Sequence, residues 1–345
     1  MRVIGTLYRA VSIAAAILLA ISYLSVFISP AVITFPGFFG LYYLPLAFLN
    51  AALLIGALFF RSRSAFISAA ALVPSVFLAG HFVRFGGEDG REPCRDSLMS
   101  VMTYNVGRFL SADGLSPDES LGGVCSLIAS SSPDIVCLQE CAVDAGDDAC
   151  IMPASYPYTA KRLFRVNGGY SGNVIMSRYP IVGSGTVDFG KSANMALFAD
   201  INFKGRVIRV YNLHLESNSI SLASLADRDG FVHVHDRMRS SAAARAAQVD
   251  AVRSDADSAP DPYVICGDFN DTPLSYAFHE LSKGMRDTFE ECGHGFGATY
   301  SGLWPMLRID YVLVQEENFT VCRHDTPKLP YSDHYPVMTV VKLNI

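Results

Sequence analysis

The stretch YVICGDFND, residues 263–271, runs from a buried strand into a group of polar side chains. Its first four residues are aromatic, β-branched or small and apolar, which is typical of a strand inside a sheet. Asp268 and Asn270 follow directly. Sheets of α/β proteins carry ligands and catalytic groups at strand ends. The stretch therefore predicts a strand over residues 263–269 with functional side chains at its carboxyl end.

On both sides of this stretch, other short β-rich runs alternate with polar loops and with helix-forming segments. Interleaved strands and helices over ~250 residues predict one layered α/β domain. The predicted helices cover about 120–130, 235–253 and 274–282. The predicted strands cover residues 100–106, 134–140, 173–179, 196–203, 206–215, 263–269, 308–314 and 336–343.

Polar residues recur at the ends of these runs. Taken singly, each is an ordinary surface or capping residue; together they supply carboxylates, imidazoles and amides. Hard oxygen ligands with few sulfurs favour Mg²⁺ or Mn²⁺, which in turn favour phosphate ligands. Such a cation can polarise a phosphoryl oxygen while a His–Asp pair activates water. The residues concerned are Asn105, Glu140, Asn212, His214, Asp268, Asn270, Asp310, Asp333 and His334.

Seven motifs in a fixed order then identify a resemblance. They are TYN (103–105), LQE (138–140), YSGNVIMSRYPI (170–181), NLHLES (212–217), CGDFND (266–271), RIDYV (308–312) and SDHYPV (332–337). From about Met99 to its end the chain resembles the endonuclease/exonuclease/phosphatase superfamily, which includes pancreatic-type deoxyribonuclease, apurinic-site endonuclease, neutral sphingomyelinases and inositol polyphosphate 5-phosphatases. The resemblance implies a metal-dependent hydrolase of phosphoester bonds. It also implies a four-layered α/β sandwich, with two mixed β-sheets face to face and helices outside.

The resemblance assigns a metal site and a base. It implies Glu140 as the principal Mg²⁺ ligand, with Asn105 beside it and Asp333 as a further carboxylate. His334 would be the general base, or the imidazole that faces the scissile phosphate. Asp310 would orient His334 through the other ring nitrogen, because an imidazole needs such a partner to fix its tautomer.

Three further residues are given catalytic roles by the same resemblance. Asp268 and Asn270 would align the attacking water and hydrogen-bond the phosphate oxygens as charge builds there. His214 matches the deoxyribonuclease-like members, where a histidine in this strand can protonate the leaving oxygen.

The substrate contacts implied by the resemblance lie in two other motifs. Tyr170 occupies the place of a phosphate-contacting tyrosine, and Asn173 is expected near the same pocket. Asn212 is expected to bind substrate as well. The chain departs from the family at Gly107, where some members carry an acidic residue. A second metal contact is therefore not expected at that position.

The N-terminal quarter of the chain has a different composition. Residues 10–60 contain no Asp, Glu, Lys or Arg. Uncharged runs of ~20 apolar residues span a bilayer as helices. We therefore expect about three transmembrane helices, with a signal peptide as the alternative for the first, because Arg2 and Arg9 precede it. The expected spans are 7–29, 38–60 and 64–83, within an anchor over residues 1–86, followed by a linker (87–97) and a catalytic domain (98–345).

Basic residues suggest how the anchor is oriented. Arg2 and Arg9 lie at the start of the first apolar run, and Arg61 and Arg63 separate the second from the third. Positive flanks remain in the cytoplasm, so three crossings place the catalytic domain outside it. The predicted location is a bacterial inner membrane, although two crossings would reverse the exposure.

The cysteines agree with an oxidising compartment. All eight follow the apolar runs, and an even count suits disulfides. Their spacing fixes no connectivity. Cys141 and Cys150, on either side of a short acidic loop, are the first pair to consider, whereas Cys137 and Cys266 fit buried free thiols.

Charge and composition limit the choice of substrate. Of 27 basic and 33 acidic residues, 20 and 30 lie from Asp96 onward, a formal charge of −10 there. This gives no support for tight duplex binding. The leading hypothesis is nevertheless a membrane-anchored, Mg²⁺-dependent nuclease. Next come a phosphodiesterase acting on phospholipid, sphingomyelin-type or other small substrates, and then a phosphomonoesterase.

A catalytically inactive binding module is the alternative from a different class. Loss of Glu140, Asp268 or His334 would argue for it, but all three are present. The predicted partners are a phosphodiester substrate and the bilayer, and no protein partner is predicted.

Overall fold

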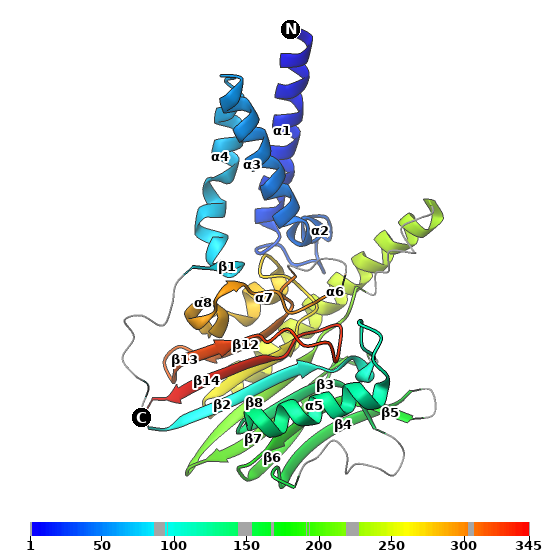
Figure 1. Cartoon of the computed structure of the whole chain (residues 1–345), viewed down its shortest axis with the longest axis vertical. Coiled ribbons are helices and arrows are strands. Elements are labelled where there is room, and N and C mark those ends of the chain that lie inside the picture. Colours follow the sequence, from blue (N-terminus) through cyan, green and yellow to red (C-terminus); the bar gives the residue numbers. More distant parts are fainter. Residues whose placement is uncertain are drawn as a thin grey trace. The chain divides into compact units, whose positions relative to one another are not determined.

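The computed structural model describes residues 2–85, 94, 96–143, 154–166, 169–190, 192, 194–218, 228–302 and 307–344. The chain forms two compact units, and Figure 1 labels most of their helices and strands. The first unit comprises Met1–Phe82, Asn218–Ala246 and Asp271–His279. The second comprises Val83–Ser217, Ala247–Asn270 and Glu280–Ile345.

The second unit contains two six-stranded mixed sheets. The first has the order β13-β14-β2-β3-β5-β4 and consists of β2 (Leu98–Asn105), β3 (Ile135–Val143), β4 (Tyr158–Val166), β5 (Gly169–Ser177), β13 (Phe319–Asp325) and β14 (Val337–Leu343). The second has the order β10-β12-β9-β8-β7-β6 and consists of β6 (Ile181–Val187), β7 (Met195–Phe203), β8 (Arg206–His214), β9 (Tyr263–Asp268), β10 (Met285–Asp287) and β12 (Asp310–Gln315). A separate ribbon pairs β1 (Val83–Arg84) with β11 (Gly295–Phe296).

The main core lies between the two sheets. Val101 and Ile175 from the first sheet pack with Val210, Val264 and Val312 from the second, and all five are buried. Side chains alternate between the faces of a strand, so the other face of each sheet needs its own cover.

Helix α5 (Pro117–Ser131) covers the outer face of the first sheet, as Figure 1 shows. Its Val124 and Ile128 pack with Tyr104 of β2. The helix begins at a capping box, in which Ser116 Oγ accepts from Glu119 N and the Glu119 carboxylate accepts from Ser116 N. This pairing satisfies backbone donors that a helix leaves free at its start.

The last turns of α6 (Arg228–Ser258) belong to the second unit and cover the other sheet. Val249 and Val252 are fully buried there. Tyr211 of β8 donates its hydroxyl to Asp255 Oδ1 at 2.5 Å. The remaining helices are short, namely α7 (Tyr276–Leu281) and α8 (Thr288–Cys292). The layers are thus helix, sheet, sheet and helix, which confirms the predicted α/β sandwich.

The helices of the first unit correct the expectation of three spans. Among the described residues, α1 (Arg2–Leu24) alone is a single helix long and apolar enough to cross a membrane. α2 (Phe35–Leu41) and α3 (Tyr43–Phe59) meet that criterion only together and are bent by 70°. α4 (Ala65–Leu78), with the 3₁₀ turn η1 (Ala79–His81), falls short of it. The described residues therefore contain one helix that could span a membrane, or two spans if the bent pair α2–α3 forms a single one.

Backbone chemistry explains both differences. Pro45 has no N–H to donate to the carbonyl of Leu41, so α2 cannot continue into α3. α4 has 14 residues. At a rise of ~1.5 Å per residue it reaches roughly 21 Å, which is less than the ~30 Å hydrocarbon core of a bilayer.

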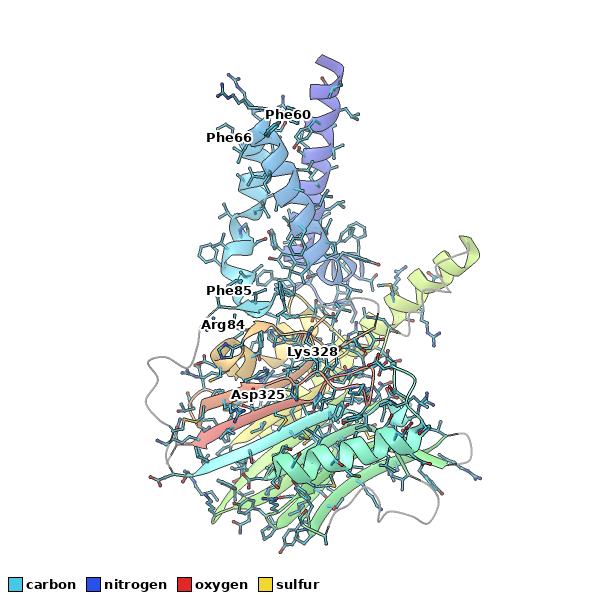
Figure 2. All side chains as sticks on the ribbon, in the orientation of Figure 1. Phe60, Phe66, Arg84, Phe85, Asp325 and Lys328 are labelled. Carbon is cyan, nitrogen blue, oxygen red and sulfur yellow. A yellow bond between two sulfur atoms is a disulfide. The ribbon has the colours of Figure 1, made fainter. Side chains whose placement is uncertain are left out.

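The first unit nevertheless has polar contacts inside and apolar side chains outside. Asn50 is fully buried, and its Nδ2 donates to Ala15 O at 3.0 Å and to Leu46 O at 2.9 Å. Phe59, Phe66 and Phe77 are 78–82% exposed, and Figure 2 labels Phe66. Soluble surfaces rarely expose so many large apolar side chains together, whereas interhelical hydrogen bonds of this kind occur in membrane helices.

A disulfide joins Cys94 to Cys322 and thereby ties the segment before β2 to β13. Cys137 and Cys266 are buried free thiols, as expected. The pair Cys141–Cys150 stays a prediction, because Cys150 lies outside the described residues. The same is true of most of the expected linker.

His324 on β13 gives the second unit a pH-sensitive point. Its Nδ1 lies 2.9 Å from Thr288 Oγ1. Burial lowers the pKa of His324 from 6.5 to about 4; Asp287 opposes this shift and Arg308 adds to it. The unfolded chain therefore binds a proton that the folded chain does not. Lowering the pH from 6.5 to 4 should therefore reduce the free energy of unfolding by on the order of 3 kcal/mol through His324, since one pKa unit corresponds to ~1.4 kcal/mol.

We expect His324→Gln to flatten the pH dependence of urea unfolding in that window. Above pH 6.5 His324 is neutral in both the folded and the unfolded chain. Residue 324 should therefore cause no pH dependence of the free energy of unfolding there, in wild type or in His324→Gln. His294→Gln, at an exposed position, is the control and should keep the wild-type slope. Equal slopes for wild type and His324→Gln would contradict the assignment.

Candidate active site

The sheet topology brings the predicted site residues to one edge. β2 and β3 are parallel, as are β8 and β9, so Asn105, His214 and Asp268 stand at the carboxyl ends of their strands. β12 and β14 run antiparallel to β9 and β2. Their beginnings therefore lie at the same edge, and Asp310 is directly opposite Asp268. His334 precedes β14.

A buried histidine–aspartate pair lies at the centre of this edge. His334 Nδ1 is 2.9 Å and 3.1 Å from the two carboxylate oxygens of Asp310. Thr299 Oγ1 accepts from Asp310 N, and the Tyr300 ring packs against the His334 ring at 5.0 Å between centroids. His334 Nε2 is directed toward Asp268, 3.8 Å from its Oδ2. The pair therefore holds the ring in one orientation.

The carboxylates around this pair control its protonation. Burial alone would lower the pKa of His334, but Asp310, Asp268 and Asp333 outweigh burial and raise it to about 10. Burial raises the pKa of the Asp310 carboxyl, although His334 opposes the shift. A nearby negative charge favours the protonated imidazole. His334 can accept a proton near neutral pH only if some of this negative charge is neutralised.

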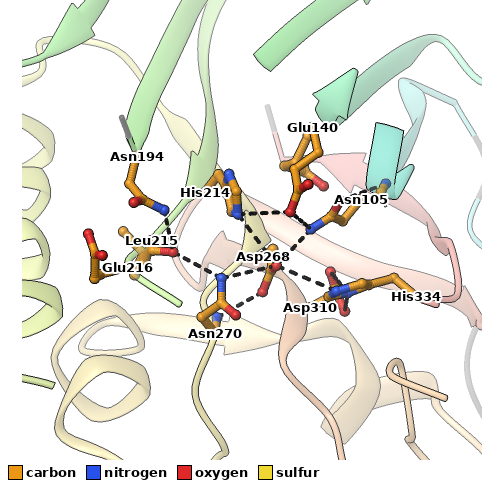
Figure 3. A network of polar contacts seen from close by, with 12 residues as sticks. Asn105, Glu140, Asn194, His214, Leu215, Glu216, Asp268, Asn270, Asp310 and His334 are labelled. Atoms are coloured by element: carbon orange, nitrogen blue, oxygen red, sulfur yellow. Dashed lines mark hydrogen bonds and ion pairs between the residues drawn. The ribbon is translucent and has the colours of Figure 1, made fainter. Parts of the chain in front are cut away.

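Asp268 and Asn270 form a fixed polar group beside the pair, shown in Figure 3. Asp268 Oδ1 accepts from Asn270 N at 2.8 Å, and Oδ2 accepts from Asn105 Nδ2 at 2.9 Å. Asn270 Nδ2 donates to Leu215 O at 2.9 Å. Asn270 has φ 51°, a left-handed conformation that asparagine tolerates better than most residues.

A β-bulge directs Glu140 into the site. The register between β3 and β5 shifts between Leu138 and Cys141, and Glu140 has φ 48°. Bulges re-aim side chains next to active sites. Glu140 Oε1 lies 3.5 Å from Asn105 Nδ2 and 3.6 Å from His214 Nε2, which Figure 3 also shows. The Glu140 side chain is 34% exposed, so a ligand can reach it.

Asp333 lies next to the turn that follows Asn105. Its Oδ1 accepts from Ser332 Oγ at 3.3 Å, and Ser332 Oγ also donates to Asn105 O at 2.8 Å. A Cβ on Gly107 would stand 3.0 Å from Asp333 Oδ1. Gly107 has φ 50°, so a larger residue would strain both the turn and this contact.

Three predicted residues are not joined to this group. Tyr170 is 42% exposed on β5, opposite Val143, and no hydrogen bond links it to the other site residues that are described. Asn173 and Asn212 are fully buried between the sheets. Asn173 Nδ2 donates to Asn212 O, at 2.9 Å.

Asn212 connects the two sheets. Its Nδ2 donates to Leu138 O at 2.9 Å and to Val174 O at 3.0 Å, and its Oδ1 accepts from Gln139 Nε2 at 2.6 Å. The side chain is thus occupied by structural contacts and does not face an open surface.

The donor set suits a divalent cation. Asp268, Asp310 and His334 offer ligand atoms within 4.8 Å of one another, but His334 and Asp310 already bond to each other. Glu140, with Asn105 beside it, offers a more open carboxylate. The pKa of Tyr300 is raised by burial and then by Asp333, Asp268 and Glu140. The carboxylates of Asp333, Asp268 and Glu140 thus all lie near the Tyr300 hydroxyl. Sites rich in carboxylate oxygens suit Mg²⁺ or Mn²⁺.

The structure adds contacts that the sequence did not single out. Arg108 Nε lies 3.8 Å from Glu140 Oε2, in a turn where Arg108 itself has φ 55°. Thr299 and Tyr300 contact the histidine–aspartate pair, and Ser332 bonds to Asn105 O and Asp333. Only Ser332 had a signal, because it begins the SDH motif.

We expect a divalent cation to lower the pKa of His334. Asp333, one of the carboxylates that raise this pKa, is also a proposed ligand of the cation, and a positive charge bound beside His334 would oppose the effect of Asp310 and Asp268 as well. The measurement is a histidine ¹³Cε1 NMR titration of the full chain in micelles, with and without Mg²⁺. The exposed His294 is the internal control and should not move. An unchanged His334 titration would show that the cation does not bind beside it.

Comparisons with known proteins agree with this geometry. A model for the Endonuclease/Exonuclease/phosphatase family matches residues 102–334, and a model for a domain of unknown function, DUF8431, matches residues 5–82. No curated protein sequence matches the chain.

Solved structures share the fold at low identity. The catalytic domain of human Nocturnin with bound sulfate is 18% identical, covers 73% of this chain and 97% of its own, and has a TM-score of 0.54. D. rerio TDP2 complexed with single strand DNA product is 21% identical, with 72% and 100% coverage and a TM-score of 0.51. An endonuclease/exonuclease/phosphatase from Beutenbergia cavernae is 22% identical, with 72% coverage of both chains and a TM-score of 0.51.

The family match covers about two thirds of the chain and includes the whole polar edge from Asn105 to His334. The fold and the order of the motifs agree with it. The chain therefore belongs to the endonuclease/exonuclease/phosphatase family, whose members hydrolyse phosphoester bonds.

Proposed function

We propose that the chain is a membrane-anchored, Mg²⁺-dependent phosphodiesterase that cleaves nucleic acid. The observation that carries this proposal is the buried His334–Asp310 pair, which faces Asp268 beside the open carboxylate of Glu140. On this proposal a general base and a cation that binds the phosphate would lie at one edge of the sandwich, as hydrolysis of a phosphodiester requires.

Each residue of the group has a proposed role. Glu140, Asn105 and Asp333 would hold Mg²⁺, or Mn²⁺ in its place. When bound, the cation would polarise a phosphoryl oxygen and neutralise charge. His334 accepts a proton from the attacking water, and Asp310 keeps its Nδ1 protonated. The attacking water is assigned to a position beside His334 Nε2 and Asp268 Oδ2, which are 3.8 Å apart and can therefore share one hydrogen-bonded water that lies to one side of both.

The remaining roles concern the phosphate and the leaving group. Asn270 Nδ2 donates to Leu215 O at 2.9 Å and to Asp268 Oδ2 at 3.2 Å, which uses both of its hydrogens and fixes Asp268. It would hydrogen-bond a phosphate oxygen by exchanging the longer of these two bonds. His214 Nε2 faces Glu140 and Asp268, where it can give a proton to the leaving oxygen. Tyr170 stays a candidate phosphate contact. Asn173 and Asn212 would hold the strands of the two sheets in place through their hydrogen bonds to backbone carbonyls, rather than bind substrate.

Membership of a family that includes endonucleases and exonucleases favours nucleic acid as the substrate. One structural neighbour, D. rerio TDP2, is complexed with single strand DNA product. A phospholipid or sphingomyelin-type phosphodiesterase is the second candidate, because the first unit exposes large apolar side chains that suit a bilayer. A phosphomonoesterase would use the same site.

Nicking of supercoiled plasmid by the full chain in detergent micelles tests the proposal. We expect nicking with Mg²⁺, none with a chelator, and none from His334→Gln. Release of phosphocholine from sphingomyelin vesicles without nicking would favour the lipid substrate instead. Hydrolysis of p-nitrophenyl phosphate alone would favour the phosphomonoesterase.

We also propose that residues 1–86 anchor the chain, that 87–97 form the linker and that 98–345 form the catalytic domain. α1 is the first crossing, and Arg2 and Arg9 favour a cytoplasmic start. The disulfide Cys94–Cys322 supports an oxidising compartment for the catalytic domain, outside the cytoplasm of a bacterial inner membrane. Protease added to intact spheroplasts should digest that domain, and protection until lysis would contradict this orientation.

A further inference from the structure

The two-stranded ribbon β1–β11 exposes aromatic side chains on the second unit. Val83 pairs with Phe296 and Arg84 with Gly295. Phe85, directly after β1, is 94% exposed, and Phe296 is 52% exposed. Figure 2 labels Arg84 and Phe85. Two residues of this size in water on so short a ribbon indicate a contact surface.

Chain connectivity relates this ribbon to the apolar helices. β1 starts two residues after η1, which ends at His81 and directly follows α4. An extended chain gains at most ~3.6 Å per residue. Wherever the end of η1 meets the surface of a bilayer, β1 must therefore begin within ~7 Å of that point, and β11 is hydrogen-bonded to β1.

We propose that the β1–β11 ribbon is a contact of the catalytic unit with the bilayer surface. Phe85 and Phe296 insert into the interfacial region, and Arg84 lies at the level of the lipid phosphates. This matches the way interfacial segments bind, with apolar side chains in the acyl boundary and basic ones among the headgroups. The inference depends on the proposed membrane anchoring.

The ribbon also leads directly into the active site. Three residues after Phe296, Thr299 Oγ1 accepts from Asp310 N, and Thr299 O accepts from Tyr335 N. Tyr300 packs on the His334 ring at 5.0 Å. A bilayer that holds the ribbon thereby restrains the segment that positions the histidine–aspartate pair. Phe85 and Phe296 are positioning residues in this sense, since they act through Thr299 and Tyr300.

Quenching by brominated lipids tests the contact in the full chain. The one native tryptophan, Trp304, is first replaced by Phe. Phe85→Trp and Phe296→Trp are then compared with Val182→Trp, at a residue of β6 that is 59% exposed, in nanodiscs of phosphatidylcholine with brominated acyl chains. We expect strong quenching and a blue-shifted emission at positions 85 and 296 and neither effect at 182.

Emission at 85 and 296 that equals the emission at 182 would overturn the proposal. Carbonate extraction of the same proteins separates this result from failure of the anchor. A chain that resists extraction but shows no quenching retains its anchor and lacks the contact. A chain that carbonate removes from membranes has lost the premise as well, and both proposals would then fail.

The effect on the site has its own readout. Phe85→Ser/Phe296→Ser removes two apolar contacts, each worth roughly a tenfold change in membrane partitioning or more. In nanodiscs we expect kcat for phosphodiester hydrolysis to fall several-fold, because the His334–Asp310 pair is positioned less well. KM should change little, because the substrate contacts are intact. Val182→Ser should leave both constants unchanged. Unchanged kcat in the double variant would contradict the coupling.

Discussion

His334→Gln is expected to lower kcat/KM for a phosphodiester by ~10²–10⁴-fold, the usual contribution of a positioned general base. Glutamine keeps much of the volume and a hydrogen bond to Asp310 but cannot take a proton from water. The His334 ring is buried, and its Nδ1 is already bonded to Asp310, so Nε2 is the nitrogen left for catalysis. Single-turnover hydrolysis of bis-p-nitrophenyl phosphate with saturating Mg²⁺ measures this effect.

Two comparisons make the result specific. His294→Gln, at an exposed position, should retain wild-type activity. Asp310→Asn should lose most of the activity too, because the amide cannot stabilise the imidazolium or fix its tautomer. Activity of His334→Gln close to wild type, in a protein with unchanged circular dichroism, would remove His334 from the mechanism.

Arg308→Met is expected to destabilise the folded chain by ~3–5 kcal/mol, since it leaves a buried charge without its partner. Arg308 Nη1 lies 2.5 Å from Asp287 Oδ2, and both side chains are only 3% exposed. The guanidinium also stacks on the rings of Phe289 and Tyr311, at 4.8 Å and 4.7 Å. Urea unfolding in one detergent, followed by circular dichroism, measures the change.

An exposed pair in the same unit provides the matched control. Arg323 Nε lies 2.6 Å from Asp325 Oδ2, but these side chains are 63% and 46% exposed. Arg323→Met should therefore cost ~0–1 kcal/mol. Equal losses for the two variants would mean that burial does not govern the Arg308–Asp287 pair.

Much of the fold could be predicted because buried central strands have clear patterns. β9 and β12 contain the continuous apolar runs YVIC and YVLV, since both faces of these strands are covered. Edge strands were missed. β4 carries Lys161, Arg162 and Arg165, and such charges protect an edge from further pairing while hiding it from a hydrophobicity pattern.

Glycines concealed a second edge strand, β6. Gly183 and Gly185 suggest a turn, yet a Cβ on Gly185 would come within 2.6 Å of the Phe198 ring. The glycine makes room for that ring, onto which Arg209 also stacks at 4.1 Å. This is a tertiary requirement that local sequence does not express.

The sequence could predict those site residues that lie at or next to the ends of strands. Asp268, Asp310 and His334 meet as their motifs imply, because strand direction places them at one edge. The β-bulge that turns Glu140 was not predictable, since a bulge depends on the pairing partner. Asn212 shows the converse, because a polar residue in a strand can serve the contact between sheets rather than a ligand.

The site is divided between the two sheets. Asn105 and Glu140 belong to the first, and His334 lies in the loop that leads into β14 of the same sheet, whereas Asp268 and Asp310 belong to the second. The amide of Asn212 locks one sheet to the other directly beneath this seam. In the proposed mechanism, the position of His334 relative to the attacking water therefore depends on how the two sheets pack, and a small slip between the sheets would misalign them. Substitutions deep in the inter-sheet core can therefore lower turnover before they lower stability.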